Sequence, residues 1–133
     1  MTEEYPIDGV ASPDPSYDPD RVVELQLSAL AANDDPFENA GIAAAYNFAS
    51  PANRRSTGPF DRFVRMVTGP QYAPMVDHAR ATTGPMERNG RRAEQRVTIT
   101  GPDGRTETYA FGLSADRAGE LDGHWLTDRV VLE

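Results

Sequence analysis

The chain of 133 residues has no cysteine, no lysine and only two histidines. Without cysteine, disulfides and thiolate chemistry are excluded. Two histidines give no support for a histidine-rich metal site, and we expect no cofactor. No apolar run approaches the length of a membrane span, and no basic-then-apolar signal peptide opens the chain. These features predict a cytoplasmic protein with no membrane partner.

The formal net charge of -8 is distributed unevenly. Residues 1–20 contain six acidic residues and no basic one, whereas the rest of the chain is nearly balanced, with 15 acidic residues and 13 arginines. Because phosphate binding needs clustered positive charge, an acidic chain argues against a nucleic-acid partner. The small basic cluster at Arg54 and Arg55 does not reverse this conclusion.

The domain boundary follows from composition. Residues 1–17 hold three prolines, a glycine and scattered acidic residues, and such a segment cannot bury enough apolar surface to offset its ordering entropy. We therefore expect a disordered or loosely draped acidic tail over residues 1–17 and a single α+β domain over residues 18–133.

Three helices are predicted in the first half of the chain. The first follows the N-cap candidate Asp18, with Pro19 at its first helical position. The second covers about residues 39–49 and ends before Pro51, because a residue that precedes proline avoids the helical region. The third begins near Pro59, since its apolar residues recur at i, i+3, i+4 and i+7: Phe60, Phe63, Val64 and Val67.

The second half of the chain predicts a four-stranded antiparallel sheet, because polar and apolar residues alternate there. Residues 101–104, Gly-Pro-Asp-Gly, fit a three-residue hairpin loop. This loop pairs Val97 with Tyr109 and Gln95 with Phe111, so the aromatic residues share one face, which should pack on the helices. Two threonine pairs fall on the other, solvated face: Thr98 with Thr108, and Thr100 with Thr106.

An Asn89-Gly90 turn predicts the pairing of the first long strand. It would place Arg80 opposite Ile99 and Thr82 opposite Val97, so that Arg80 and Thr82 would lie on the inner face. Gly84-Pro85 interrupts this strand, and a proline inside a strand marks an edge or a bulge.

Three segments carry a family resemblance: GIAAAYNFASPANR, TGPFDRFVRMV and HWLTDRVV. With three helices before four strands, the chain resembles the nuclear-transport-factor-2-like (cystatin-like cone) superfamily. More narrowly, it resembles an uncharacterised domain-of-unknown-function family of small bacterial, archaeal and plant proteins. The resemblance implies a curved, cone-shaped sheet around the helices, a pocket at the open end and a homodimer through the sheet face. It transfers no catalytic residue.

The first candidate site groups His78, Arg80 and Glu107 at one end of the inner face, with Gln95 and Tyr109 further in. A histidine beside a carboxylate could act as a general base, and an arginine could steer an anion. A polar sheet end with an ordinary ion pair fits the same residues.

Two other candidates stand apart from this group. Asp128 alternates with Leu126 and Val130 and would face the core, where a carboxylate could abstract a proton; it could instead face solvent or pair with a neighbour. Arg54 and Arg55 could hold an anion in the connector after the second helix. Alternatively, one of them satisfies carbonyl groups at the end of that helix.

These observations favour a non-enzymatic module that binds a partner or a small lipophilic or anionic ligand. The alternative is a small-molecule isomerase, cyclase or hydrolase that uses Asp128 or His78 in the cone. The fold alone does not choose between them.

Overall fold

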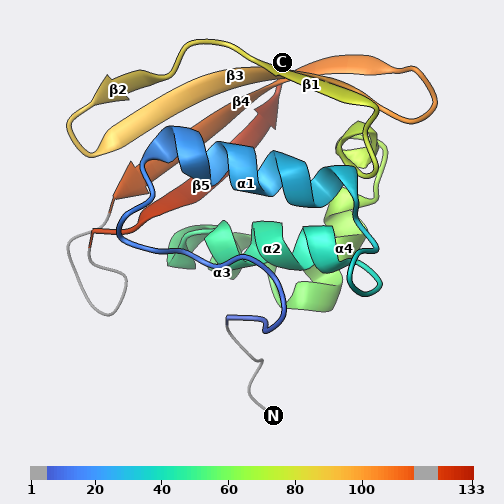
Figure 1. The fold of residues 1–133 in the computed structure, drawn as a ribbon, viewed down its shortest axis with the longest axis horizontal. Helices are drawn as coiled ribbons and strands as arrows, with labels where there is room; N and C mark the ends of the chain where they lie inside the picture. Colours follow the sequence, from blue (N-terminus) through green and yellow to red (C-terminus); the bar gives the residue numbers. More distant parts are fainter. Residues whose placement is uncertain (1–5, 116–122) are drawn as a thin grey trace.

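The computed structural model describes residues 6–115 and 123–133. This part of the chain forms four α-helices and five antiparallel strands (Figure 1). The helical elements are α1 (Pro19–Ala31), α2 (Ala40–Phe48), α3 (Pro51–Thr57), α4 (Phe60–Val67) and the short 3-10 helix η1 (Ala73–Met75). The strands are β1 (Arg80–Thr83), β2 (Glu87–Asn89), β3 (Arg92–Thr100), β4 (Thr106–Ala115) and β5 (Trp125–Leu132).

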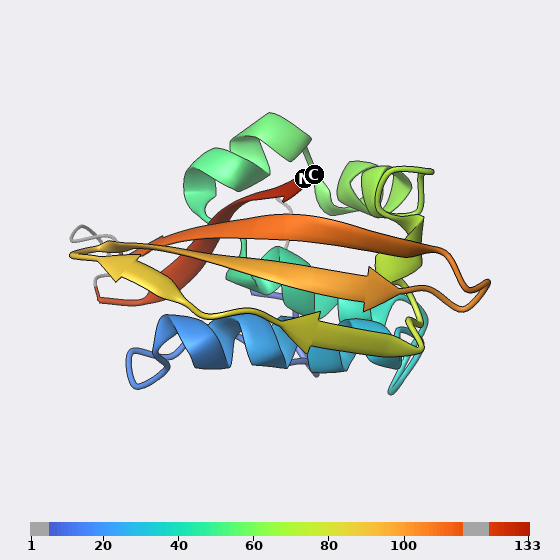
Figure 2. The same ribbon diagram turned by 90° about the horizontal axis from the view of Figure 1, so that it is seen from above.

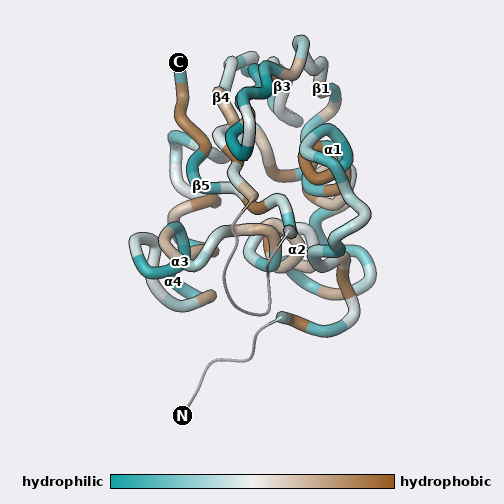
Figure 3. Tube along the Cα trace, turned by 90° about the vertical axis from the view of Figure 1, so that its left-hand side faces the viewer, coloured by the Kyte–Doolittle hydropathy of each residue, from teal (hydrophilic) through white to brown (hydrophobic). Residues whose placement is uncertain are grey.

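The sheet covers the helices on one side. Its strand order is β1-β3-β4-β5, and β2 pairs with β3 beyond the end of β1. From above, α1 lies along the β1 edge while α3 and α4 lie on the β5 side (Figure 2). In the hydropathy-coloured view, β5 lies on the side of the molecule opposite α1, next to β4 (Figure 3). The space between α1 and the α3–α4 pair is therefore bounded by β5.

The predicted first and third helices are confirmed as α1 and α4. Asp18 caps α1, because its Oδ1 accepts a hydrogen bond of 3.0 Å from the Arg21 backbone N–H. The aspartate thus satisfies one of the N–H groups that a helix start leaves unpaired. The helix α4 begins directly after Pro59, as its apolar spacing predicts.

The prediction of three helices is wrong by one, because Ser50-Pro51 ends α2 and also starts α3. The Ser50 Oγ accepts a 3.2 Å hydrogen bond from the Asn53 backbone N–H, and Pro51 occupies the first turn. Serine at the cap and proline at the next position are a helix start signal. The expected connector around Arg54 and Arg55 is therefore helical.

The helix α2 is buried on every side, whereas its sequence predicted one apolar face. Alanine and glycine dominate it, and small side chains let neighbouring backbones approach closely. A Cβ built on Gly41 would lie 2.3 Å from the carbonyl oxygen of Ala29 in α1. This contact makes α2 the central helix of the domain.

The predicted β3–β4 register is confirmed residue by residue. Val97 pairs with Tyr109, and Gln95 with Phe111. The threonine pairs lie on the outer face, where the Thr98 and Thr108 hydroxyls are 3.1 Å apart. Tyr109 and Phe111 are buried against the helices.

The predicted pairing of the first long strand is wrong, and the predicted four strands become five. The turn residues are Gly90 and Arg91, because Asn89 pairs with Arg92. Past the interruption at Gly84-Pro85 the register changes again, so that Arg80 pairs with Thr100 instead of Ile99. A shift of one residue exchanges the faces of a strand. Arg80 and Thr82 therefore lie on the outer face with the threonine pairs.

The described part of the expected tail lies against α2. Asn47, which is fully buried, accepts a 2.8 Å hydrogen bond from the Ile7 N–H through Oδ1. Its Nδ2 donates to the carbonyl oxygens of Ile7 at 3.0 Å and Ala11 at 3.1 Å. Ile7, Ala11 and Tyr17 also pack against the core. One side chain thus anchors residues 7–11 to the domain.

The outer sheet face, where the resemblance implies a homodimer, is mainly polar around the threonine pairs. Among the described residues of the sheet, Val131 is the only exposed large hydrophobic one, with 45% exposure.

None of the helices in the described ranges has the length and apolar character needed to cross a membrane.

Candidate functional site

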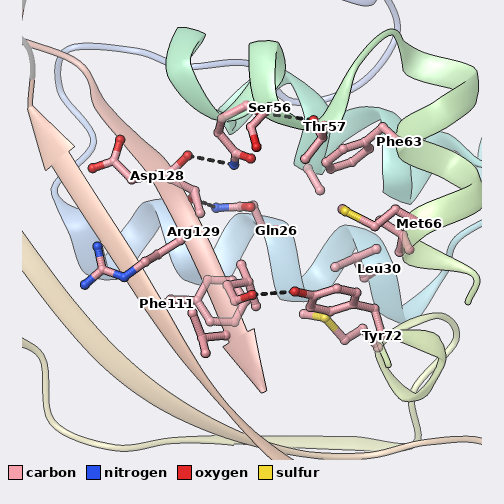
Figure 4. Close-up of a pocket in the computed structure, with 17 residues that line it drawn as sticks. Gln26, Leu30, Ser56, Thr57, Phe63, Met66, Tyr72, Phe111, Asp128 and Arg129 are labelled. Atoms are coloured by element: carbon pink, nitrogen blue, oxygen red, sulfur yellow. Dashed lines mark hydrogen bonds between the residues drawn. The ribbon is translucent and has the colours of Figure 1, made fainter. Parts of the chain in front are cut away.

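A cavity of about 320 Å³ lies between α1, α3, α4 and β5 (Figure 4). We call it the β5 cavity. Its walls are mainly apolar, with a few polar side chains at one end. The apolar lining residues are Leu30, Ala45, Phe63, Met66, Val67, Tyr72, Met75, Phe111, Val130 and Val131.

Hydrogen bonds connect β5, on one side of the cavity, to the helices on the other side. The edge of β5 bonds to the junction between α2 and α3, where the Ser50 N–H donates to the Thr127 carbonyl oxygen at 2.8 Å. Asn53 adds a second link from α3, because its Nδ2 donates to the same oxygen at 3.1 Å. At Gly58 the chain takes a positive φ of 86° and leads into α4. The helices α3 and α4 are thereby fixed beside β5.

Gln26 is the polar residue of α1 that reaches the cavity. Its side chain is buried, with 3% exposure. The amide nitrogen donates to the Thr127 Oγ1 at 2.8 Å and to the Val22 carbonyl oxygen at 3.2 Å. Among the described residues the amide oxygen has no hydrogen-bond partner. The buried side-chain atoms without a partner do not include this oxygen, so it is accessible from the cavity that Gln26 lines.

Tyr72 forms another part of the wall, and its hydroxyl is already used. It donates to the Val130 carbonyl oxygen at 2.7 Å, and Gln71 Nε2 approaches it at 3.3 Å. The ring stacks on Tyr109 with 5.9 Å between centroids. Burial raises the pKa of Tyr72 above its ordinary value. The residue is a neutral, fixed wall at physiological pH.

Asp128 does not follow the alternation that predicted its orientation. The β4–β5 register shifts between Gly112 and Leu113, opposite Thr127 to Arg129. Such a bulge adds one residue to a strand and breaks the period of two. Asp128 is this extra residue, half-buried at the cavity wall, and its carboxylate points away from Phe63 and Met66 (Figure 4).

The structure separates the group predicted around His78. His78 and Arg80 line a depression beside α1, and the His78 Nδ1 lies 2.8 Å from the Met75 carbonyl oxygen. Glu107 instead forms an ion pair with Arg105, with 3.0 Å between Oε2 and Nε. Tyr109 lies in the core, where its hydroxyl donates to the Gln71 carbonyl oxygen at 2.8 Å.

Gln95 lines the same depression as His78, from β3. Its Nε2 donates to the Gly84 carbonyl oxygen at 2.8 Å. Its Oε1 is buried without a hydrogen-bond partner among the described residues.

Arg54 and Arg55 lie together near the end of α3 and line an open depression on its outer side. The Arg54 Nε donates to the Ala49 carbonyl oxygen at 3.4 Å. This bond is the expected structural alternative, in which one arginine satisfies a carbonyl group at the end of α2. Within residues 6–115 and 123–133, no cluster of three or more His, Asp or Glu side chains could hold a metal ion.

The sequence prediction missed Gln26, although its signal was present. Gln26 lies on the apolar face of α1, together with Val22, Val23, Leu27 and Leu30. A polar residue on an otherwise apolar helical face must find a buried partner or a polar cavity. Its partner Thr127 could not be identified without the position of β5.

Comparison with protein-family models matches residues 16–132 to the family described as Domain of unknown function (DUF4864). No curated protein and no solved structure matches the chain.

Proposed function

This chain belongs to the DUF4864 family, and we propose that it binds a small, largely apolar molecule in the β5 cavity. The carrying observation is a mainly apolar cavity of about 320 Å³ between the helices and β5. Ligand pockets span roughly 300–1,000 Å³ and are lined mainly by hydrophobic side chains with a few placed polar groups. The β5 cavity has the size and the lining of a small member of this class.

The energetics of packing support a ligand. The cavity is partly open to solvent, so its apolar walls contact water. An apolar molecule of matching shape would displace that water and bury the apolar surface of Phe63, Met66 and Phe111. We also propose that the chain belongs to the nuclear-transport-factor-2-like superfamily, which the helices under an antiparallel sheet support. Domains of that superfamily are expected to hold a pocket at the open end of the cone.

Binding fits the geometry better than the alternative isomerase, cyclase or hydrolase. Asp128 is at the cavity wall with its carboxylate turned away, and His78 lines a different depression. General acid–base catalysis needs the group within hydrogen-bond reach of the reacting atom. The side chains of Asp128 and His78 therefore cannot act together on a substrate bound in this cavity.

The test uses isothermal titration calorimetry with propylbenzene on the full chain. A matched pair of variants separates cavity binding from surface binding. Ala45→Leu adds bulk to a residue that lines the cavity, whereas Ala52→Leu adds the same bulk to an exposed position of α3. We expect saturable 1:1 binding to the wild type and to Ala52→Leu, and a loss of at least about tenfold in Ala45→Leu.

The proposal fails if propylbenzene does not bind the wild type, or if it binds all three proteins equally. Circular dichroism of each variant shows whether Ala45→Leu is folded. If that variant does not fold, Met66→Trp at the partly exposed cavity wall replaces it as the blocking substitution.

A further inference from the structure

We infer that the ligand of the β5 cavity presents a neutral hydroxyl or amide group to Gln26, and that the cavity discriminates against carboxylates. This inference rests on the proposed function and adds to it the polar chemistry of the ligand. It starts from the amide oxygen of Gln26, which has no hydrogen-bond partner in the described part of the chain.

The hydrogen bonds of Gln26 fix which end of its amide faces the ligand. The nitrogen is held by two acceptors, Thr127 Oγ1 at 2.8 Å and the Val22 carbonyl oxygen at 3.2 Å. Rotating the amide by 180° would set its oxygen against the Val22 carbonyl, which cannot donate. The oxygen is consequently the atom available inside the cavity, and it can only accept a hydrogen bond.

Thr127 supplies the complementary group. Its hydroxyl accepts from Gln26, so its own proton is free to be donated, and no acceptor for that proton lies within the described residues. The cavity therefore holds an acceptor and a donor side by side, on α1 and β5. A ligand hydroxyl satisfies both groups at once, and so does a primary amide.

Apart from the Ser56 hydroxyl, the other polar groups that line the cavity are already engaged or negatively charged. The Tyr72 hydroxyl and the Asn53 amide nitrogen already donate to backbone carbonyl oxygens of β5. Arg129 lies 3.6 Å from Glu94 in an exposed ion pair. Asp128 adds a negative charge to the wall. A carboxylate ligand would be desolvated beside this charge and beside the Gln26 oxygen, and the lining cation Arg129 is already paired with Glu94.

Four probes of similar size separate the possibilities. Propylbenzene reports on the apolar cavity alone. 2-Phenylethanol and benzyl methyl ether are isomers, but only the alcohol can donate a hydrogen bond. Phenylacetate carries the negative charge. In the wild type we expect the alcohol to bind roughly fivefold to tenfold more tightly than the ether, which is the size of one net hydrogen bond, and phenylacetate to bind most weakly.

The variant Gln26→Leu identifies the residue responsible. It removes the acceptor at nearly constant volume, so the alcohol and the ether should bind equally, while propylbenzene binding is retained or improved. Ser28→Leu, at an exposed position of the same helix, is the control and should keep the wild-type preference.

Each result has one meaning. If no probe binds, the proposed function fails. If propylbenzene binds but the wild type does not prefer the alcohol to the ether, or prefers phenylacetate, this inference fails while the proposed function stands. If the preference persists in Gln26→Leu, the inference is also overturned. Should Gln26→Leu not fold, Gln26→Met is used, and the wild-type comparison of the two isomers decides by itself.

Discussion

Gln26 and Thr127 are 101 residues apart in the chain, and a buried hydrogen bond of 2.8 Å joins their side chains. The bond connects α1 to β5 across the base of the β5 cavity. The helix lies along the β1 edge of the sheet and β5 is at the opposite edge. The bond is therefore a cross-brace of the domain as well as a part of the candidate site.

Thr127→Val should destabilise the fold. The substitution keeps the shape of the side chain but removes the hydroxyl that accepts from Gln26, and it leaves a buried amide nitrogen with only the Val22 carbonyl oxygen. We expect a loss of about 1–2 kcal/mol in the free energy of unfolding, measured by urea denaturation. Thr127→Ser retains the hydroxyl and should lose less. Equal losses in the two variants would show that packing of the methyl group contributes as much as the bond and would contradict this prediction.

Asn47→Ala should release residues 7–11 from α2. Asn47 is fully buried and makes three hydrogen bonds to the backbone of Ile7 and Ala11. Their removal leaves three part-buried backbone groups without these partners, so we expect a loss of about 2–4 kcal/mol. Limited proteolysis should then cut near residues 7–11 at protease concentrations that leave the wild type intact. Unchanged proteolysis would show that the apolar contacts of Ile7 and Tyr17 hold the segment without Asn47.

Gly41→Ala should be among the most damaging single-methyl additions. The new Cβ would lie 2.3 Å from the Ala29 carbonyl oxygen, so α1 and α2 would have to separate, at a cost of about 3 kcal/mol or more. Gly90→Ala is the control, because no atom lies within 4 Å of its added Cβ, and only the positive φ of 63° opposes it. That backbone conformation costs about 1–2 kcal/mol for alanine. Thermal unfolding of both variants compares the two causes, and a Gly41→Ala loss no larger than that of Gly90→Ala would contradict the close helix crossing.

The accuracy of the sequence predictions followed the amount of local information. The β3–β4 register was predictable because the turn at residues 101–104 joins the two strands directly, and the threonine pairs check its phase. The first long strand was not, since its turn is displaced by one residue and a second irregularity at Gly84-Pro85 changes the register. Each one-residue shift turns the side chains of the strand to the other face of the sheet. The net shift at β1 is one residue, so Arg80 lies on the outer face and the predicted proximity of Arg80 and Glu107 is wrong.

The β5 cavity could not be predicted from local sequence signals, because the residues that line it are far apart in the chain. Gln26 is recognisable as a polar residue on an apolar helical face, but its hydrogen-bond partner depends on which strand contacts that face of α1. The orientation of Asp128 depends on a bulge opposite Gly112, which no turn residue announces. Ser50-Pro51 predicts the end of one helix, and the same two residues also begin α3.

Tyr109 should make the domain sensitive to alkaline pH. Its side chain is fully buried, and desolvation raises its pKa from 10.0 to about 12. The fold favours the neutral phenol, so this contribution to stability is complete below the unfolded-state pKa of about 10 and is lost as the pH rises toward 12. Urea denaturation at pH 8, 10 and 11 should show a falling free energy of unfolding. Tyr72, which also has a raised pKa, contributes in the same direction.

Tyr109→Phe separates the phenol from the other titrating groups. At pH 8 the variant should lose about 1 kcal/mol, because its ring cannot donate to the Gln71 carbonyl oxygen. Above pH 10 its stability should fall less steeply than that of the wild type, so the two curves converge. Parallel curves would mean that the Tyr109 phenol ionises with the same pKa in the folded and unfolded chains. The buried hydroxyl would then not be the source of the alkaline transition.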